Sequence, residues 1–228
     1  MKLEKITTKT KRRYEDSCGT AHALDLVGER WALLVMRELM LGPRRFSDLR
    51  ANLPGVSANV LTQRLESLEG SGVLRRRKLP PPASVQVYEL TEWGLEAEPI
   101  ILSLGRWGAR SPLQDDSLPI SAMSAILSMR AMFDPARTEE KLDMTLAFHF
   151  DQDAYTVNVR EGRLTAERGE ADEVDVEIRG SPSDVLGVVY GLSSLEEAER
   201  AGMLTVTGDR AGFLRFASAF ELPPKACA

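Results

Sequence analysis

Four polar side chains that follow a proline–glycine turn have the chemistry to read the edges of DNA bases. Pro54 and Gly55 make the turn, and the hydroxyl oxygen of Ser57 can cap the free amides of a helix that starts after it. The four side chains lie at the cap and on the outward face of the first turns: Ser57, Asn59, Thr62 and Gln63. Amides and hydroxyls match the donors and acceptors of a major groove, whereas Glu66 and Glu69 would be repelled by phosphates. The sequence therefore predicts DNA contact by the N-terminal half of this face only.

A run of four basic residues follows the glycines that end this helix. Arg75, Arg76, Arg77 and Lys78 lie on an extended segment, and residues 73–79 and 84–90 predict a two-stranded hairpin around three prolines. Because side chains alternate along a strand, about half of this run points away from the core in either register. We expect Arg76, Arg77 and Lys78 to hold DNA phosphates.

Three further arginines lie near this predicted surface. Arg44 and Arg45 precede a short helix that would cross the DNA backbone, so both are predicted phosphate contacts, with a solvated surface pair as the alternative. Arg64 lies near the apolar stripe of the polar helix. It either extends to a phosphate or pairs with a carboxylate inside its own domain.

The elements that must position these side chains form a recognisable order. An apolar helix from Trp31 to Leu41, a Gly42-Pro43 stop, a short helix, a turn, the polar helix and the basic hairpin predict a winged helix-turn-helix. Five motifs appear in order: G-x-x-W-x-L-L, G-P-x-R-F-x-x-L, L-P-x-[IV]-S, L-T-x-R-L-x-x-L-E, and L-T-x-x-G after the hairpin. This pattern, over roughly residues 17–110, resembles the HxlR family of bacterial transcription regulators. The resemblance implies a sequence-specific DNA-binding regulator.

A helix after the hairpin is the candidate dimerisation element. Its apolar residues are spaced four, three, four and three apart, as in a heptad seam: Trp93, Ala97, Ile100, Leu104 and Trp107. The helix is predicted from the Thr91 cap to Arg110, with Pro99 interrupting the pattern; packing against its own domain is the alternative. The HxlR resemblance implies dimerisation through terminal helices. A twofold homodimer would place two recognition helices about 34 Å apart on double-stranded DNA and favour an inverted-repeat operator.

Charge divides the chain into two halves. Residues 1–112 hold 18 lysines and arginines against 13 acidic residues, a net of +5, whereas residues 113–228 hold 11 against 21, a net of −10. A basic half suits DNA and an acidic half stays away from phosphates. We expect a flexible basic arm at 1–16, a DNA-binding and dimerisation domain at 17–110, a linker at 111–119 and a second domain at 120–228.

The second half predicts an α+β layer. Leu142, Met144, Leu146, Phe148 and Phe150 alternate with polar or small residues, and two later runs repeat the alternation. Period two with one polar face predicts an antiparallel sheet covered on one face by helices, which are expected at 120–133, 183–190, 194–201 and 210–220.

Residues 120–222 resemble sterol-carrier-protein-like domains. The resemblance rests on an extended D-V-x-I-x-G-x-P-x-D run, a helix, A-G-x-L-x-V-x-G-D and a final helix. It implies a cavity between sheet and helices that accepts an apolar ligand. The candidate lining residues are Met123, Leu127, Phe148, Phe150, Phe213 and Phe216. The alternative is that these side chains simply fill the core.

Catalytic and metal-binding patterns are absent from the sequence. With only His22 and His149, no Cys/His spacing for zinc and no phosphate-binding or nucleophile motif, we expect no metal, no cofactor and no enzymatic activity. No apolar run reaches the roughly eighteen residues of a membrane span, and the two cysteines lack a disulfide pattern. A cytoplasmic protein is expected.

Cys18 is the one reactive candidate. It stands at the start of the first helix, where amide dipoles and Arg12 and Arg13 could lower its pKa. In the HxlR family some members sense oxidants through a cysteine at this position, although here Cys18-Gly19 replaces the usual Cys-Pro. Three readings follow: a DNA-binding regulator, a carrier of lipid-like molecules whose first domain only dimerises, and a redox-responsive regulator.

Overall fold

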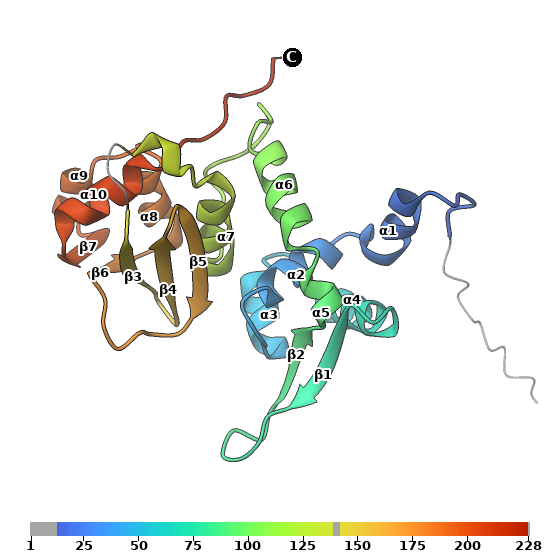
Figure 1. Cartoon of the computed structure of the whole chain (residues 1–228). Coiled ribbons are helices and arrows are strands. Elements are labelled where there is room, and N and C mark those ends of the chain that lie inside the picture. Colours follow the sequence, from blue (N-terminus) through green and yellow to red (C-terminus); the bar gives the residue numbers. More distant parts are fainter. Residues whose placement is uncertain (1–12, 139–141, 228) are drawn as a thin grey trace, which may run out of the picture.

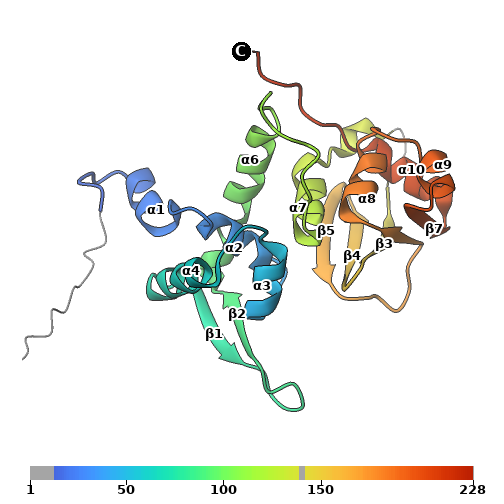
Figure 2. The ribbon, with the colours of Figure 1, turned by 180° about the vertical axis from the view of Figure 1, so that it is seen from behind.

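A computed structural model describes residues 13–138 and 142–227, and its N-terminal half is a winged helix-turn-helix (Figure 1). Four helices precede a two-stranded hairpin and two more helices follow it. These elements are α1 (Gly19–Val27), α2 (Ala32–Leu39), α3 (Phe46–Asn52), α4 (Ala58–Gly70), β1 (Leu74–Lys78), β2 (Gln86–Leu90), α5 (Glu92–Leu95) and α6 (Glu98–Gly108). The predicted winged helix-turn-helix is confirmed. The hairpin projects from the body of the molecule with α4 beside its base (Figure 2).

Local chemistry explains why α4 forms where it does. The Ser57 hydroxyl accepts a hydrogen bond from the amide of Val60 at 3.3 Å, which satisfies a free donor at the start of the helix. Leu61, Leu65 and Leu68 are buried against α2, because they share one face of the helix. Gly72 then takes a φ of +75°, a backbone conformation that favours glycine, and the chain turns into β1.

The helix predicted from Thr91 to Arg110 is two helices, α5 and α6. Thr91 caps α5 by accepting from the amide of Gly94 at 3.1 Å. Pro99 lies in the first turn of α6, where its missing amide hydrogen costs no helical hydrogen bond. The predicted continuous seam from Trp93 to Trp107 is therefore wrong in its first half.

The second half carries a five-stranded sheet in the order β5-β4-β3-β6-β7. Its elements are α7 (Ala122–Met132), a short 3-10 turn (Pro135–Arg137), β3 (Met144–Phe150), β4 (Asp153–Arg160), β5 (Arg163–Arg168), β6 (Val176–Gly180), α8 (Pro182–Val189), α9 (Leu195–Arg200), β7 (Leu204–Gly208) and α10 (Arg210–Ser218). Helix α7 packs on β5, and α8 and α10 pack on β6. Within the described ranges, no helix is both long and apolar enough to cross a bilayer.

The predicted antiparallel sheet is wrong at one pair of strands. β3, β4 and β5 form an antiparallel meander, but β6 returns beside β3 and runs parallel to it, with Leu146 opposite Val176 and Phe148 opposite Ile178. The sheet is therefore mixed. Side chains alternate with period two in both kinds of pairing, so the sequence pattern could not distinguish them.

A buried ion pair joins the two halves. Arg44, which is 8% exposed, donates from Nη1 and Nη2 to the two carboxylate oxygens of Asp153 at 2.6 and 2.8 Å, and from Nη2 to the Tyr155 hydroxyl at 2.9 Å. Arg168 donates to the Pro43 carbonyl at 3.0 Å. Helices α6 and α7 also pack side by side (Figure 1). One buried core runs through both halves, and the domain boundaries proposed from the sequence stay predictions.

Replacing Asp153 with asparagine should destabilise the whole chain. The buried guanidinium of Arg44 would then lack the carboxylate that it bonds to, and the nearby charge of Arg168 would repel it, so we expect a loss of about 3 kcal/mol in the free energy of unfolding. Urea unfolding followed by circular dichroism measures it. Arg137→Ala, which breaks an exposed pair with Glu221, is the matched control and should change stability by less than about 0.5 kcal/mol. Equal midpoints for Asp153→Asn and the unchanged protein would contradict this role.

Candidate nucleic-acid interface

Helix α4 presents a polar face that the rest of the molecule leaves open. Asn59, Thr62 and Gln63 are exposed, and none of the three makes a side-chain hydrogen bond to another described residue. Ser57 is also exposed, with its oxygen engaged as the helix cap. Side chains without internal partners are free to bond to base edges. The four residues that the sequence assigned to base contact are thus brought together on one surface.

The arginines of the hairpin are exposed but have carboxylate partners. Arg75 donates to Glu89 at 2.7 Å and Arg77 lies 2.9 Å from the same carboxylate. Arg76 donates through Nε to Glu69 at 2.7 Å. The Arg76–Glu69 pair is partly exposed, and pairs of this kind contribute at most about 1 kcal/mol, so a phosphate can replace Glu69 at little cost. Glu89 is buried, so it holds Arg75 and Arg77 more firmly.

The pKa values of the two carboxylates reflect these contacts. Burial acts to raise the pKa of Glu89, but the hydrogen bonds from Arg75 and Arg77 outweigh it and leave the pKa below its ordinary value. A hydrogen bond from Arg76 lowers the pKa of Glu69. Both carboxylates are therefore ionised at neutral pH and hold the arginines in place on the hairpin.

The remaining basic residues of the predicted interface divide into two groups. Arg45 and Lys78 are exposed and form no ion pair with another described residue. Arg44 is wrong as a phosphate contact, because its guanidinium is buried against Asp153. Arg64 lies 3.5 Å from Glu29, so of its two sequence-based roles the internal carboxylate pair is the one found.

An exposed apolar stripe lies on α6. Ile100 and Trp107 are 58% and 74% exposed, and Trp93 on α5 and Leu104 are exposed as well. Ala97, the fifth residue of the predicted seam, instead packs against the core. Large apolar side chains gathered on one helix are typical of a surface that another protein covers.

The six residues predicted to line a ligand pocket are buried core residues. Phe148, Phe150, Phe213 and Phe216 contact one another, with ring centroids 6.0 to 6.4 Å apart, and Met123 is fully buried. These side chains pack against one another in the core, and a ligand cavity among them stays a prediction.

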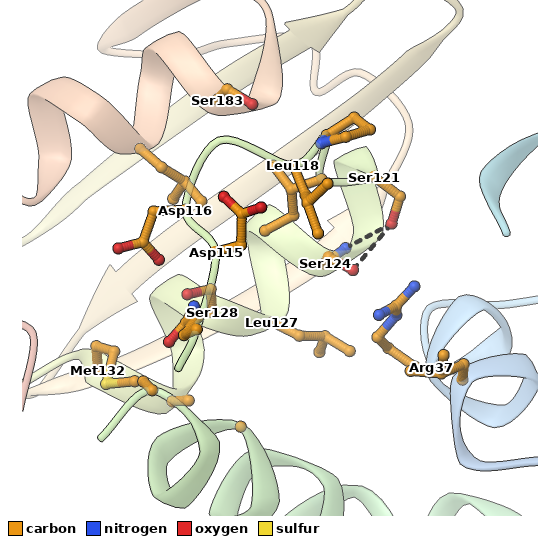
Figure 3. Close-up of a pocket in the computed structure, with 18 of the residues that line it drawn as sticks. Arg37, Asp115, Asp116, Leu118, Ser121, Ser124, Leu127, Ser128, Met132 and Ser183 are labelled. Carbon is orange, nitrogen blue, oxygen red and sulfur yellow. Dashed lines mark hydrogen bonds between the residues drawn. The ribbon is translucent and has the colours of Figure 1, made fainter. Parts of the chain in front are cut away.

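A cavity of about 580 Å³ lies elsewhere, between the two halves (Figure 3). It is bordered by α2, α6, residues 114–121, α7 and α8, and Leu127 is the only predicted pocket residue on its wall. One sequence signal could have indicated this site: Asp115, Asp116 and Leu118 stand together in a segment that has no regular structure.

Cys18 is exposed at the start of α1. The backbone amides of Ala21 and Thr20, together with the Thr20 hydroxyl, lower the pKa of its thiol because they stabilise the thiolate. Arg12 and most of the predicted basic arm at 1–16 lie outside the described residues. Cys227, the other cysteine, is exposed on the C-terminal segment, which returns to the end of α6 where the Ala226 amide donates to the Arg110 carbonyl at 2.7 Å.

The capped helix, its turn and the basic hairpin define a DNA-binding transcriptional regulator of the winged helix-turn-helix class. The family model described as HxlR-like helix-turn-helix matches residues 26–115. The chain is 37% identical over 92 residues to the HTH-type transcriptional regulator sll1512 of Synechocystis, covering 40% of this chain and 68% of that one. It is 33% identical over 85 residues to the HTH-type transcriptional regulator YodB of Bacillus subtilis, a match that covers 37% of this chain and 76% of YodB. The chain belongs to the HxlR-like helix-turn-helix family through its N-terminal half.

The chain also resembles solved structures of redox regulators, and its second half matches a separate family model. The oxidised redox regulator HypR is 31% identical, covers 40% of this chain and 94% of its own, and gives a TM-score of 0.38. Reduced YodB from B. subtilis is 29% identical, and the match covers 44% of this chain and 100% of the YodB chain with a TM-score of 0.39. Residues 111–226 match the family model described as Alkyl sulfatase C-terminal. For the second half the comparisons thus name a different family from the sterol-carrier-like one expected.

The thiol of Cys18 should react at lower pH than an ordinary cysteine. Its lowered pKa gives a larger thiolate fraction at any pH below the ordinary value, and the thiolate is the nucleophile. The pH profile of iodoacetamide alkylation, measured on a Cys227→Ser variant so that only one thiol is present, should have its midpoint below that of a blocked cysteine peptide. A midpoint at or above the peptide's would show that the amides do not act on this sulfur.

Proposed function

We propose that this protein is a homodimeric, sequence-specific regulator in which α4 reads bases and the hairpin holds the DNA backbone. The observation that carries the proposal is the open polar face of α4, where Asn59, Thr62 and Gln63 have no internal hydrogen bonds. Arg76, Arg77 and Lys78 on the hairpin, with Arg45 before α3, are the proposed phosphate contacts. Ser57 fixes the first turn of the reading helix.

Dimerisation in this proposal uses the exposed stripe of α6. Ile100, Leu104 and Trp107 are spaced four and three apart, so they share one face of the helix, and Trp93 extends that surface onto α5. A twofold axis through this face makes the same patch serve both copies. Two α4 helices about 34 Å apart would then read an inverted repeat on double-stranded DNA.

The second half would stay away from DNA and regulate its binding. Its net charge of −10 over residues 113–228 repels phosphates. The sterol-carrier resemblance supports an apolar ligand for this half, and no catalytic role is proposed for it. Because its proposed partner is chromosomal DNA, we propose that the protein acts in the cytoplasm.

Phosphate contact by the hairpin is tested by the salt dependence of DNA affinity. Each phosphate contact steepens the slope of log affinity against log salt by about one, so Arg76→Ala with Arg77→Ala should flatten that slope by about two. Fluorescence anisotropy across a salt series measures it. Arg163→Ala with Arg200→Ala removes the same charge from exposed positions of the second half and should leave the slope unchanged. Equal slopes for the two double variants would remove the hairpin from the interface.

The dimer is tested by placing charge on α6. Leu104→Glu with Trp107→Glu alters two exposed side chains, so the fold should persist while sedimentation velocity shifts from dimer to monomer. Met203→Glu with Leu214→Glu, also at exposed apolar positions, is the control and should remain dimeric. A double α6 variant that still sediments as a dimer would require a different interface.

A redox-responsive regulator is a second candidate, favoured by the exposed Cys18 and its lowered pKa. In that case oxidant should change DNA affinity in the wild-type protein and have no effect on Cys18→Ser. The carrier alternative predicts instead no specific DNA binding and a hydrophobic molecule that copurifies with the chain.

A further inference from the structure

The cavity between the halves has the size and lining of a small-molecule site. Its volume of about 580 Å³ falls within the range of ligand pockets, roughly 300–1,000 Å³. Leu102 on α6, Leu127 and Met132 on α7, and Leu186 on α8 supply apolar wall. Hydroxyls are interspersed: Ser124 bonds to Ser121, as Figure 3 shows. Such a wall suits an apolar body with one polar group.

The charges around this cavity leave an excess of negative charge. Arg37 borders it on one side, and Asp115 and Asp116 lie on the opposite side (Figure 3). Arg37 is already neutralised, because its Nε and Nη2 both donate to one oxygen of the neighbouring Glu38, at 3.1 and 2.8 Å. Asp115 accepts only from Ser117 in the described part of the chain, and neither aspartate has a cationic partner there.

A buried carboxylate behind the wall balances the charge of Arg37. Glu38 is fully buried, and its Oε1 accepts from Arg37 and from the Ser121 hydroxyl at 2.8 Å. Its other oxygen, Oε2, has no hydrogen-bond partner among the described residues. The Arg37 guanidinium on the wall is thus committed to a buried acid. Lys225 approaches the same wall, where its Nζ donates to Gln114 Oε1 at 3.5 Å, but the two charges of Asp115 and Asp116 exceed its single charge.

We propose that this cavity binds a small organic cation with an apolar body. The cationic group would lie against Asp115 and Asp116, and the body would cover Leu102, Leu127 and Leu186. Neither carboxylate would need to be desolvated fully, because both stand on the exposed segment at the edge of the cavity. This places the ligand between the halves rather than inside the sheet domain.

The same cavity reaches the turn of the helix-turn-helix. Asn52, Leu53 and Pro54, which connect α3 to α4, form part of its wall. Pro54 lies three residues before Ser57, the cap of the reading helix. A ligand that fills the cavity would therefore also contact the segment that precedes α4. Regulation of DNA binding through this contact rests on the proposed function, whereas ligand binding itself does not.

Calorimetry with three chains of equal length tests the binding claim on the full-length protein. Decyltrimethylammonium should bind about tenfold more tightly than decanoate, with decanol between them, because the two carboxylates attract the cation and repel the anion; tenfold corresponds to about 1.4 kcal/mol. Asp115→Asn with Asp116→Asn should remove that preference and leave decanol affinity unchanged. Asp172→Asn with Glu173→Gln removes the same charge from the exposed segment before β6 and should preserve it.

A variant in which a large side chain fills the cavity is the second test. Gly105 lines the cavity from α6, and a Cβ atom added there meets no atom within 4 Å, so Gly105→Phe should fold normally and its ring should abolish binding of all three compounds. Decanoate that binds as tightly as the cation would overturn the proposal. Unchanged binding in Gly105→Phe, or equal effects of the two charge-removing pairs, would also overturn it.

The DNA readout separates this claim from the proposed function. Saturating decyltrimethylammonium should change operator affinity about fivefold or more in the unchanged protein and not in Gly105→Phe. A change of equal size in both would mean that the cation acts outside the cavity and would contradict the coupling. If no DNA sequence is bound specifically, the regulator proposal fails, and calorimetry alone still decides whether the cavity takes a cation.

Discussion

The buried Arg44–Asp153 ion pair is the constraint on which the arrangement of the molecule depends. Arg44 stands immediately before the Arg45 cap of α3, and its backbone exchanges hydrogen bonds of 3.0 and 2.8 Å with Tyr88 on β2. Its side chain reaches across to β4 of the second half. One residue thus ties together the first helix of the helix-turn-helix, the hairpin and the sheet. Removal of either charge would leave the other buried without a partner, which is costly.

The residues around this ion pair carry more positive than negative charge. Arg168 lies in the same cluster, and burial together with repulsion from Arg44 lowers the pKa of its guanidinium. Arg44 alone pairs with the carboxylate of Asp153, with Tyr155 as an additional partner, and Arg168 adds a second positive charge nearby. Any rearrangement of β4 and β5 would alter the contacts of Arg44, and hence the positions of α3 and β2. The second half is in this way mechanically connected to the DNA-binding elements.

Features determined by near neighbours in the chain could be predicted from the sequence. The Ser57 cap, the Leu61–Leu65–Leu68 stripe and the two-stranded hairpin depend on residues near one another in the chain, and the structure has all three. The burial within β1 does not alternate, because all four basic residues of the strand are exposed. Arg44 was misassigned because its partner Asp153 is 109 residues away, which no local pattern reveals. The parallel pairing of β3 with β6 was missed because alternation is the same in both kinds of sheet. The cavity between the halves could not be predicted because its walls come from segments far apart in the chain.

Selection of bound duplexes from a random DNA pool tests the reading role of α4 most directly, when the wild-type protein is compared with Asn59→Ala/Gln63→Ala. The account predicts that the wild type recovers an inverted repeat with half-sites about one helical turn apart. The double variant, with its hairpin arginines intact, should still retain DNA but lose preference at the contacted base pairs. Recovery of the same motif by both proteins would contradict the assignment of α4 as the helix that reads the bases.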